Sequence, residues 1–479
     1  MDVSLFKTAS FPEVGQDGWL KLARKAIGDA DFDATLVSAT DDGIRIDPLT
    51  PRRAKASRIE RSDPSALWTV VQRVDDPDPA RANAQALADI DGGATGLSIV
   101  FEGAPNAFGY GLPATSEALT TALRGVPLGD VSLRVDAHPA SRASIDWLVA
   151  LLGSQRVSPA KLKLAFGIDP AAIFGGTGRL RMSIEALKAS MPQSLAHFFA
   201  LGLPGVLLEA DGRVYHNAGA TEAQELGAML ATAVLHLRMF EQARQPLVYA
   251  APHVGFATSI DQDQFLGIAK LRALRRLWTR VQQECGIEPG IAAVHAETSW
   301  RMMTARDSET NILRTTIACF AAATGGADSI SIVPYTAAHG LADAFARRVA
   351  RNTHLVLAGE SGVGFVSDPA AGSGSVEALT DALCDAAWRE FQAIEADGGI
   401  LESLAAGRLQ QNIAGARDKR LDAIKAGRKP IVGTTLYPLK TERPVTVLKA
   451  ERRAGPADGV VFCEPLLAQR LDENLEVPA

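Results

Sequence analysis

The chain has 479 residues, of which 47% are hydrophobic and 22% are charged, and its formal net charge is −6. This balance is typical of a globular protein with a large core, and such a mild charge excludes nucleic acid or an anionic membrane as an electrostatically attracted partner. No run of about 18 apolar residues predicts a membrane span. The N-terminus lacks the apolar segment of a signal peptide, and the four cysteines form no CxxC pair, so we expect reduced thiols in a cytoplasmic protein.

Residues 1–65 are predicted to form a separate N-terminal arm. The stretch FPEVGQDGWLKLARKAI predicts a short helix with Trp19, Leu22, Ala23 and Ile27 on one face. The proline-punctuated stretch DGIRIDPLTPRR that follows is typical of extended chain on a surface. Because this region cannot bury enough apolar area to form its own core, we expect it to contact a neighbouring domain or another subunit.

From residue 66 to residue 400, short apolar runs alternate with helical patterns. Parallel strands must be joined by a crossover long enough to hold a helix, so this rhythm is typical of βα units. Eight runs are expected to be strands, at residues 96–101, 131–137, 161–168, 205–210, 247–254, 291–297, 329–333 and 363–366. We therefore predict an α/β fold, a (β/α)8 TIM barrel over residues 66–400, followed by a helical and extended tail over residues 401–479.

Polar residues at the expected strand ends are candidate ligands or acid–base groups. They are Asp136, His138, Glu209, Asp211, His216, His253, His295 and Glu297. They are spread over five loops without HxH or HExxH spacing, which favours separate hydrogen-bonded groups over one metal site. A metal-dependent lyase using His216, His253 and His295 stays as an alternative. The loop DPAAGSGSVE, after the expected eighth strand, fits a phosphate cradle and a glycine-rich turn equally well.

Several stretches together resemble the methylmalonyl-CoA mutase family of adenosylcobalamin-dependent isomerases. These are ARRVARNTHLVLAGESGVGFVSDPAAGS, TARDSETNILRT, AKLRALRRLW, YHNAGATEAQEL and the pair WTVVQR and GLSIVF. The resemblance covers nearly the whole chain. It implies a barrel that threads acyl-CoA through its centre, and a C-terminal domain that binds cobalamin through an Asp-x-His-x-x-Gly turn. Asp136-Ala137-His138 begins such a turn, but Ser141 stands at the glycine position and the triplet ends an early strand, so we expect no cobalamin-binding domain.

The resemblance assigns five positions to the family's site, and only one keeps the family's residue. His216 matches the histidine in the loop after the expected fourth strand. A tyrosine near the corrin falls at Asp63, and an arginine that holds the substrate carboxylate falls at His253. A glutamine and an asparagine fall at Glu297 and Val333, after the expected sixth and seventh strands. Without the arginine, the site loses a side chain that can bind the substrate carboxylate through two N–H bonds. A glutamate in place of the glutamine would repel that carboxylate.

The altered pocket and the arm are most similar to the smaller, non-catalytic chain of heterodimeric members. We therefore expect a small subunit that binds no cofactor itself and assembles with a large catalytic chain carrying adenosylcobalamin. The alternative is a catalytic acyl-CoA mutase subunit that works with a separate cobalamin-binding polypeptide. Both interpretations leave open whether acyl-CoA binds in the barrel. An open axial channel would favour acyl-CoA binding, and a plug of side chains would favour a scaffold.

Overall fold

A closed barrel of eight parallel strands forms the centre of the computed structural model, which describes residues 14–475 except 156, 159, 160, 203, 454, 456 and 474. The strands, in chain order, are β3 (Thr69–Val74), β4 (Gly96–Ile99), β5 (Ser132–Val135), β6 (Leu164–Ile168), β8 (Val206–Asp211), β9 (Val254–Ile260), β10 (Val294–Thr298) and β11 (Ser329–Ser331). Ser329 pairs with Thr69, so β11 joins β3 and closes the barrel. The predicted (β/α)8 architecture is confirmed.

Two of the predicted strands are wrong. Residues 247–254 form the helix α11 (Leu247–Ala250) and a 3-10 turn, and β9 starts only at their last residue. Pro252 explains the error, because a proline in mid-run cannot donate to the hydrogen-bond ladder of a central strand. Residues 363–366 lie in turns and bends after a helix, so the loop DPAAGSGSVE does not follow a strand either.

The first barrel strand, β3, is missing from the predicted set. Its sequence TVVQRV carries Arg73 on a face that is buried inside the barrel, which interrupts the apolar run expected of a parallel strand. The position of each later strand in the barrel order is therefore one higher than the sequence predicts. His216 follows the fifth strand of the barrel, Glu297 lies on the seventh and Val333 follows the eighth.

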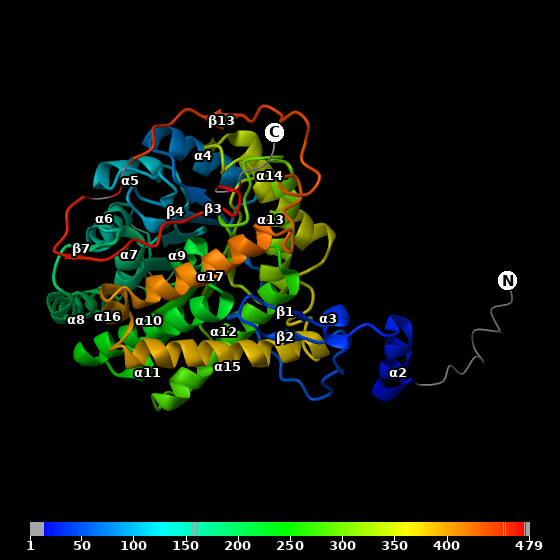
Figure 1. Ribbon diagram of the computed structural model, residues 1–479. Coiled ribbons are helices and arrows are strands. Elements are labelled where there is room, and N and C mark those ends of the chain that lie inside the picture. The colour runs from blue at the N-terminus through cyan, green and yellow to red at the C-terminus, as the bar shows by residue number, and fades with distance from the viewer. Residues whose placement is uncertain are drawn as a thin grey trace.

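Helices surround the barrel (Figure 1). They are α4 (Pro79–Asp91), α5 (Ser116–Ala122), α6 (Ser141–Ser154), α7 (Pro170–Thr177), α8 (Ile184–Ala200), α9 (Arg213–Ala218), α10 (Glu222–Gln242), α12 (Gln264–Glu284), α13 (Thr310–Thr324), α14 (Ala344–Leu355), α15 (Gly374–Ala396), α16 (Ile400–Ala405) and α17 (Arg408–Lys425). The long helix α15 packs against α10 and α12. No helix in the described ranges is long and apolar enough to cross a bilayer.

The N-terminal segment contacts the body through a small hairpin. Helices α2 (Gln16–Ile27) and α3 (Phe32–Leu36) come first, then strands β1 (Ser38–Ala39) and β2 (Arg45–Ile46). At the hairpin tip Asp41 accepts a hydrogen bond from Arg420 of α17 at 2.7 Å. The backbone N–H of Ala223, at the start of α10, donates to Asp42 at 3.4 Å. The helix predicted in the arm is α2; the predicted residues before 14 lie outside the described range.

Candidate functional site

Charged side chains from the inner faces of the strands fill the axis of the barrel. Arg134 on β5 donates two hydrogen bonds to Glu209 on β8, at 3.0 and 2.9 Å, and one to Asp136 at 3.1 Å. Arg213, at the start of α9, contacts Asp136 at 3.1 Å and Asp211 at 2.7 Å. All five side chains belong to residues that are at most 5% exposed. They form a buried ionic layer across the barrel.

The opposite side of the barrel completes this layer. Arg73 on β3 donates to Glu297 on β10 at 2.9 Å, and Arg213 approaches the same carboxylate at 3.4 Å. The hydroxyl of Ser331 on β11 also donates to Glu297, at 3.0 Å. We call the following group the axial ion layer: Arg73, Arg134, Asp136, Glu209, Asp211, Arg213 and Glu297.

The arginines of the axial ion layer are already fully engaged. Each of them contacts at least two carboxylates, since Arg73 also pairs with Asp75 at 3.0 Å. Burial by itself raises the pKa of Asp136, but Arg213 and Arg134 outweigh it and hold that pKa well below its usual range. Asp136 therefore stays charged, whereas burial raises the pKa of Glu209. None of the three arginines is free to bind the carboxylate of a substrate.

One cavity lies at each end of the barrel. A cavity of about 390 Å³ opens at the N-terminal ends of the strands, and Arg134, Glu209 and His295 line its inner end. A second cavity of about 570 Å³ lies at the C-terminal mouth, where Phe108 stacks on Trp300 with ring centroids 4.2 Å apart. Two residues of the axial ion layer, Arg134 and Glu209, line the first cavity, and no residue of the layer lines the second.

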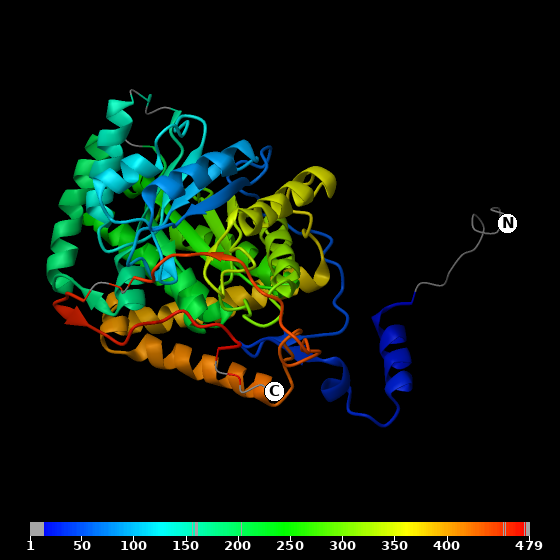
Figure 2. The same cartoon turned by 90° about the horizontal axis from the view of Figure 1, so that it is seen from above.

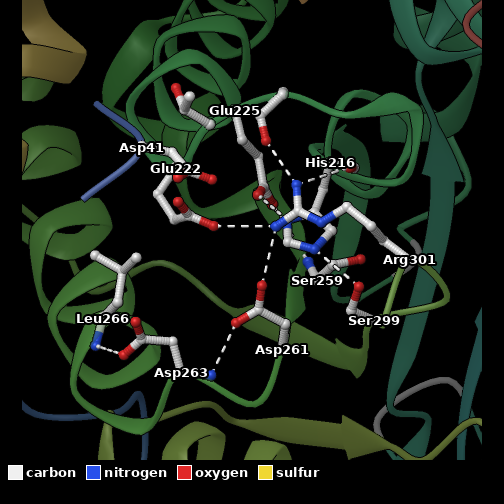
Figure 3. A network of polar contacts seen from close by, with 12 residues as sticks. Asp41, His216, Glu222, Glu225, Ser259, Asp261, Asp263, Leu266, Ser299 and Arg301 are labelled. Carbon is white, nitrogen blue, oxygen red and sulfur yellow. Dashed lines mark hydrogen bonds and ion pairs between the residues drawn. The ribbon is translucent and has the colours of Figure 1, made fainter. Parts of the chain in front are cut away.

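His216 belongs to a second polar cluster, at the C-terminal ends of β8, β9 and β10 (Figure 3). Its Nδ1 lies 2.9 Å from Glu225 of α10, and its Nε2 lies 2.9 Å from the hydroxyl of Ser299. Lys270 of α12 also pairs with Glu225 and donates to the carbonyl of Ser259 at 2.7 Å. Both ring nitrogens of the fully buried histidine therefore have protein partners.

Arg301 ties the loop after β10 to this cluster. It donates to the carbonyl of His216 at 3.2 Å, to Asp261 at 2.9 Å and to Glu222 at 3.3 Å. Burial, together with the charges of Arg301 and Lys270, holds the pKa of His216 well below its ordinary value. The imidazole is neutral, and in this arrangement it has no free nitrogen to offer to a substrate.

The five positions assigned from the resemblance do not converge on one pocket. Glu297 lies in the axial ion layer, His216 lies in the cluster outside it, and Val333 is buried in the irregular segment after β11. His253 precedes β9 and contacts a backbone carbonyl at 2.6 Å, and Asp63 precedes β3. Because parallel strands all begin at the same end, His253 and Asp63 lie at the opposite end of the barrel from the other three. The separation of His253 from His216 also removes the basis for the three-histidine lyase.

The Asp136-Ala137-His138 triplet does not fit a cobalamin site. His138 is completely buried, its Nε2 lies 3.0 Å from the hydroxyl of Ser144, and its ring packs against Phe101. Asp136 points away from it into the axial ion layer. A cobalt ligand needs an accessible nitrogen on an imidazole that is held by a carboxylate, and His138 meets neither condition. In the described part of the chain, no group of three or more His, Cys, Asp or Glu side chains could hold a metal ion.

The arginines of the layer are the residues that the sequence interpretation missed. A detectable signal was present, because charged residues repeat at a spacing of two within the strands, as in Arg134 and Asp136 or Glu209 and Asp211. Side chains at that spacing share one face of a strand. Read together across the strands, these pairs predict a charged barrel interior.

An extended C-terminal segment, residues 447–453 and 457–473, covers the C-terminal mouth of the barrel (Figure 2). It contains β13 (Val447–Leu448), which pairs with β12 (Leu341–Ala342), and β14 (Val461–Phe462), which pairs with β7 (Arg179–Leu180). Further backbone hydrogen bonds reach the loops after β4, β6, β8 and β10, from Arg453, Cys463, Gln469 and Leu471. The segment therefore holds together loops that are far apart in the sequence.

Comparison with known proteins agrees with this architecture. The family model for methylmalonyl-CoA mutase matches residues 62–458. The chain is 36% identical to the methylmalonyl-CoA mutase small subunit of Streptomyces virginiae, over 95% of this chain and 75% of the relative. It is 40% identical to the probable methylmalonyl-CoA mutase small subunit of Mycobacterium bovis, over 67% of this chain and 52% of the relative. The methylmalonyl-CoA mutase large subunit of Streptomyces virginiae is 25% identical, over 96% of this chain and 67% of the relative.

The chain thus spans three quarters of one small-subunit relative and about half of another. The family model includes the barrel strands and the loops that follow them. The chain belongs to the methylmalonyl-CoA mutase family.

Proposed function

We propose that this chain is a small, non-catalytic subunit of an adenosylcobalamin-dependent methylmalonyl-CoA mutase. In this role it binds no cobalamin and stabilises a large catalytic chain that isomerises methylmalonyl-CoA and succinyl-CoA. The assembly acts in the cytoplasm. The names of the relatives and the altered residue at the barrel axis, Glu297, support this assignment.

The axial ion layer is the observation that carries the proposal. An acyl-CoA that reached a site at the C-terminal mouth through the barrel would have to displace several buried, mutually paired charges. Leaving any of those charges without its partner costs several kcal/mol in a low-dielectric interior, on the order of 3 to 5. Arginines that already contact two carboxylates also cannot form the ion pair that would bind the carboxylate of a substrate.

The test is to measure the isomerisation of methylmalonyl-CoA by the purified chain, by a large mutase chain from the same organism, and by the two co-expressed. With added adenosylcobalamin we expect activity only where the large chain is present, and higher activity or stability when both are present. The chain alone should leave the absorption spectrum of cobalamin unchanged, since His138 is enclosed.

Turnover by this chain alone, or by this chain with a separate cobalamin-binding polypeptide, would overturn the proposal in favour of a catalytic subunit. The variant Arg134→Met/Glu209→Leu provides a matched control. It alters the axis of this barrel only, so the assembled enzyme should keep its rate if the substrate binds elsewhere.

A further inference from the structure

The later part of the C-terminal segment lies on the barrel and buries almost none of its side chains. We call this part, residues 457–473, the mouth segment. Within it, where the structure describes every residue, only Leu466 is buried, and Val460, Phe462 and Leu467 expose apolar side chains. A segment with so few buried apolar contacts contributes little to the core, and such segments open while the rest of a fold stays intact.

Backbone hydrogen bonds connect the mouth segment to the last turns of α7 and α9 and to the loop after β10. The carbonyls of a helix's last turn have no partner within the helix, so they are free to accept these bonds. Each acceptor lies outside the barrel strands, and breaking these bonds therefore leaves the strand ladder intact. The N–H groups donate from Cys463 to Gly178 at 3.0 Å, from Leu466 to Gly175 at 2.8 Å, from Gln469 to Asn217 at 2.9 Å and from Leu471 to Arg301 at 3.0 Å.

Four side chains in series connect the mouth segment to the axial ion layer. The guanidinium of Arg470 lies over the ring of Trp300, 5.7 Å from its centroid, and Trp300 stacks on Phe108. The guanidinium of Arg73, in the axial ion layer, lies 5.3 Å from the centroid of the Phe108 ring. A guanidinium over an aromatic ring is attracted by the negative face of that ring, so Arg470 holds the segment against the mouth.

Two carboxylates of the mouth segment hold Arg470 in this position. Arg470 pairs with Asp472 and with Glu473, both at 3.0 Å, and its side chain is only 12% exposed. Asp472 also accepts a hydrogen bond at 2.6 Å from the backbone N–H of Ala305, in the loop that carries Trp300. Loss of Arg470 would therefore remove the ring contact and leave Asp472 without its cation.

We propose that the mouth segment is a lid that opens and closes as one unit while the barrel stays folded, and that Arg470 is the latch that keeps it closed. Trp300 is 7% exposed in the closed state, and opening of the lid would uncover its ring. Opening would also remove one wall of the 570 Å³ cavity, which Leu467, Ala468 and Arg470 line. The lid thus controls whether a ligand reaches the aromatic rings at the mouth. This inference concerns the chain by itself and does not depend on the proposed function.

The test is hydrogen exchange of the full chain at low urea concentrations, read at single residues by mass spectrometry with fragmentation. The amides of Cys463, Leu466, Gln469 and Leu471 should share one opening constant, at least about 100-fold larger than that of the amides in β9. Exchange of these amides only together with β9 would make the segment part of the core and overturn the lid. Opening constants that differ by more than about tenfold among the four amides would overturn the single unit.

The variant Arg470→Met removes the latch and keeps a side chain of similar length. The four amides should then exchange about tenfold faster, with β9 unchanged. Arg348→Met on α14 is the matched control, because Arg348 is exposed and lies outside the mouth segment, and less than about a twofold change is expected. Leu466→Ala should independently speed exchange at the four amides by at least about tenfold. Parental exchange in Arg470→Met, or faster exchange of β9 in that variant, would overturn the role of Arg470 as a latch.

Discussion

Replacing Arg134 with methionine is expected to destabilise the barrel by about 3 to 5 kcal/mol. The arginine makes two hydrogen bonds to Glu209 and one to Asp136, in a site where all three residues are at most 5% exposed. Its removal leaves Glu209 buried without a cation. Asp136 keeps Arg213 and the hydroxyl of Ser98, at 3.1 and 2.9 Å, so the loss falls mainly on one carboxylate.

The double variant Arg134→Met/Glu209→Leu removes both charges of the pair and is expected to recover at least about 2 kcal/mol of that loss, since apolar groups of similar volume can replace a buried ion pair at little cost. Urea unfolding followed by circular dichroism gives both values. If Arg134→Met costs less than about 1 kcal/mol, or the double variant is less stable than the single one, the assignment of a paired, desolvated layer is refuted.

Other predictions concern the hairpin and the thiols. Burial and the nearby Glu222 raise the pKa of Asp42 to about 6, so its contribution to stability falls as pH rises from about 4 to about 6 and is constant above that. Asp42→Asn should therefore stabilise the chain by on the order of 1 kcal/mol at pH 8 and by less at pH 5, in urea unfolding at the two pH values. Burial raises the pKa of the Cys384 thiol to about 11, so at pH 8 only about a thousandth of it is thiolate. The exposed Cys285 should react with a thiol reagent before Cys384 does. Equal rates at the two cysteines would contradict the burial of Cys384.

The barrel was largely predictable, because its βα rhythm depends on alternation between apolar strands and amphipathic helices. The failures have local causes. A proline shifts β9 away from the apolar run at residues 247–254, and an inward-facing Arg73 hides β3. A strand of a parallel sheet is usually predicted from a continuous apolar run, because both of its faces are buried. That prediction fails where the face toward the barrel interior carries charged side chains.

The site was less predictable, because its ion pairs join residues that are far apart in the sequence. The sequence marks Glu297 and Asp136 as polar residues at strand ends. It does not show that Arg73, on another strand, pairs with Glu297 or that Arg213, at the start of α9, pairs with Asp136. His253 was misplaced because the strand before it was misplaced.

The extended C-terminal segment, residues 447–453 and 457–473, also has a consequence for biosynthesis. It bonds to loops that precede it by roughly 150 to 350 residues, so these contacts have very long loops to close and should form late in folding. While the ribosome is still translating this region, a nascent barrel would keep its C-terminal mouth uncovered. Chaperone engagement should therefore be concentrated in the interval before the mouth is covered.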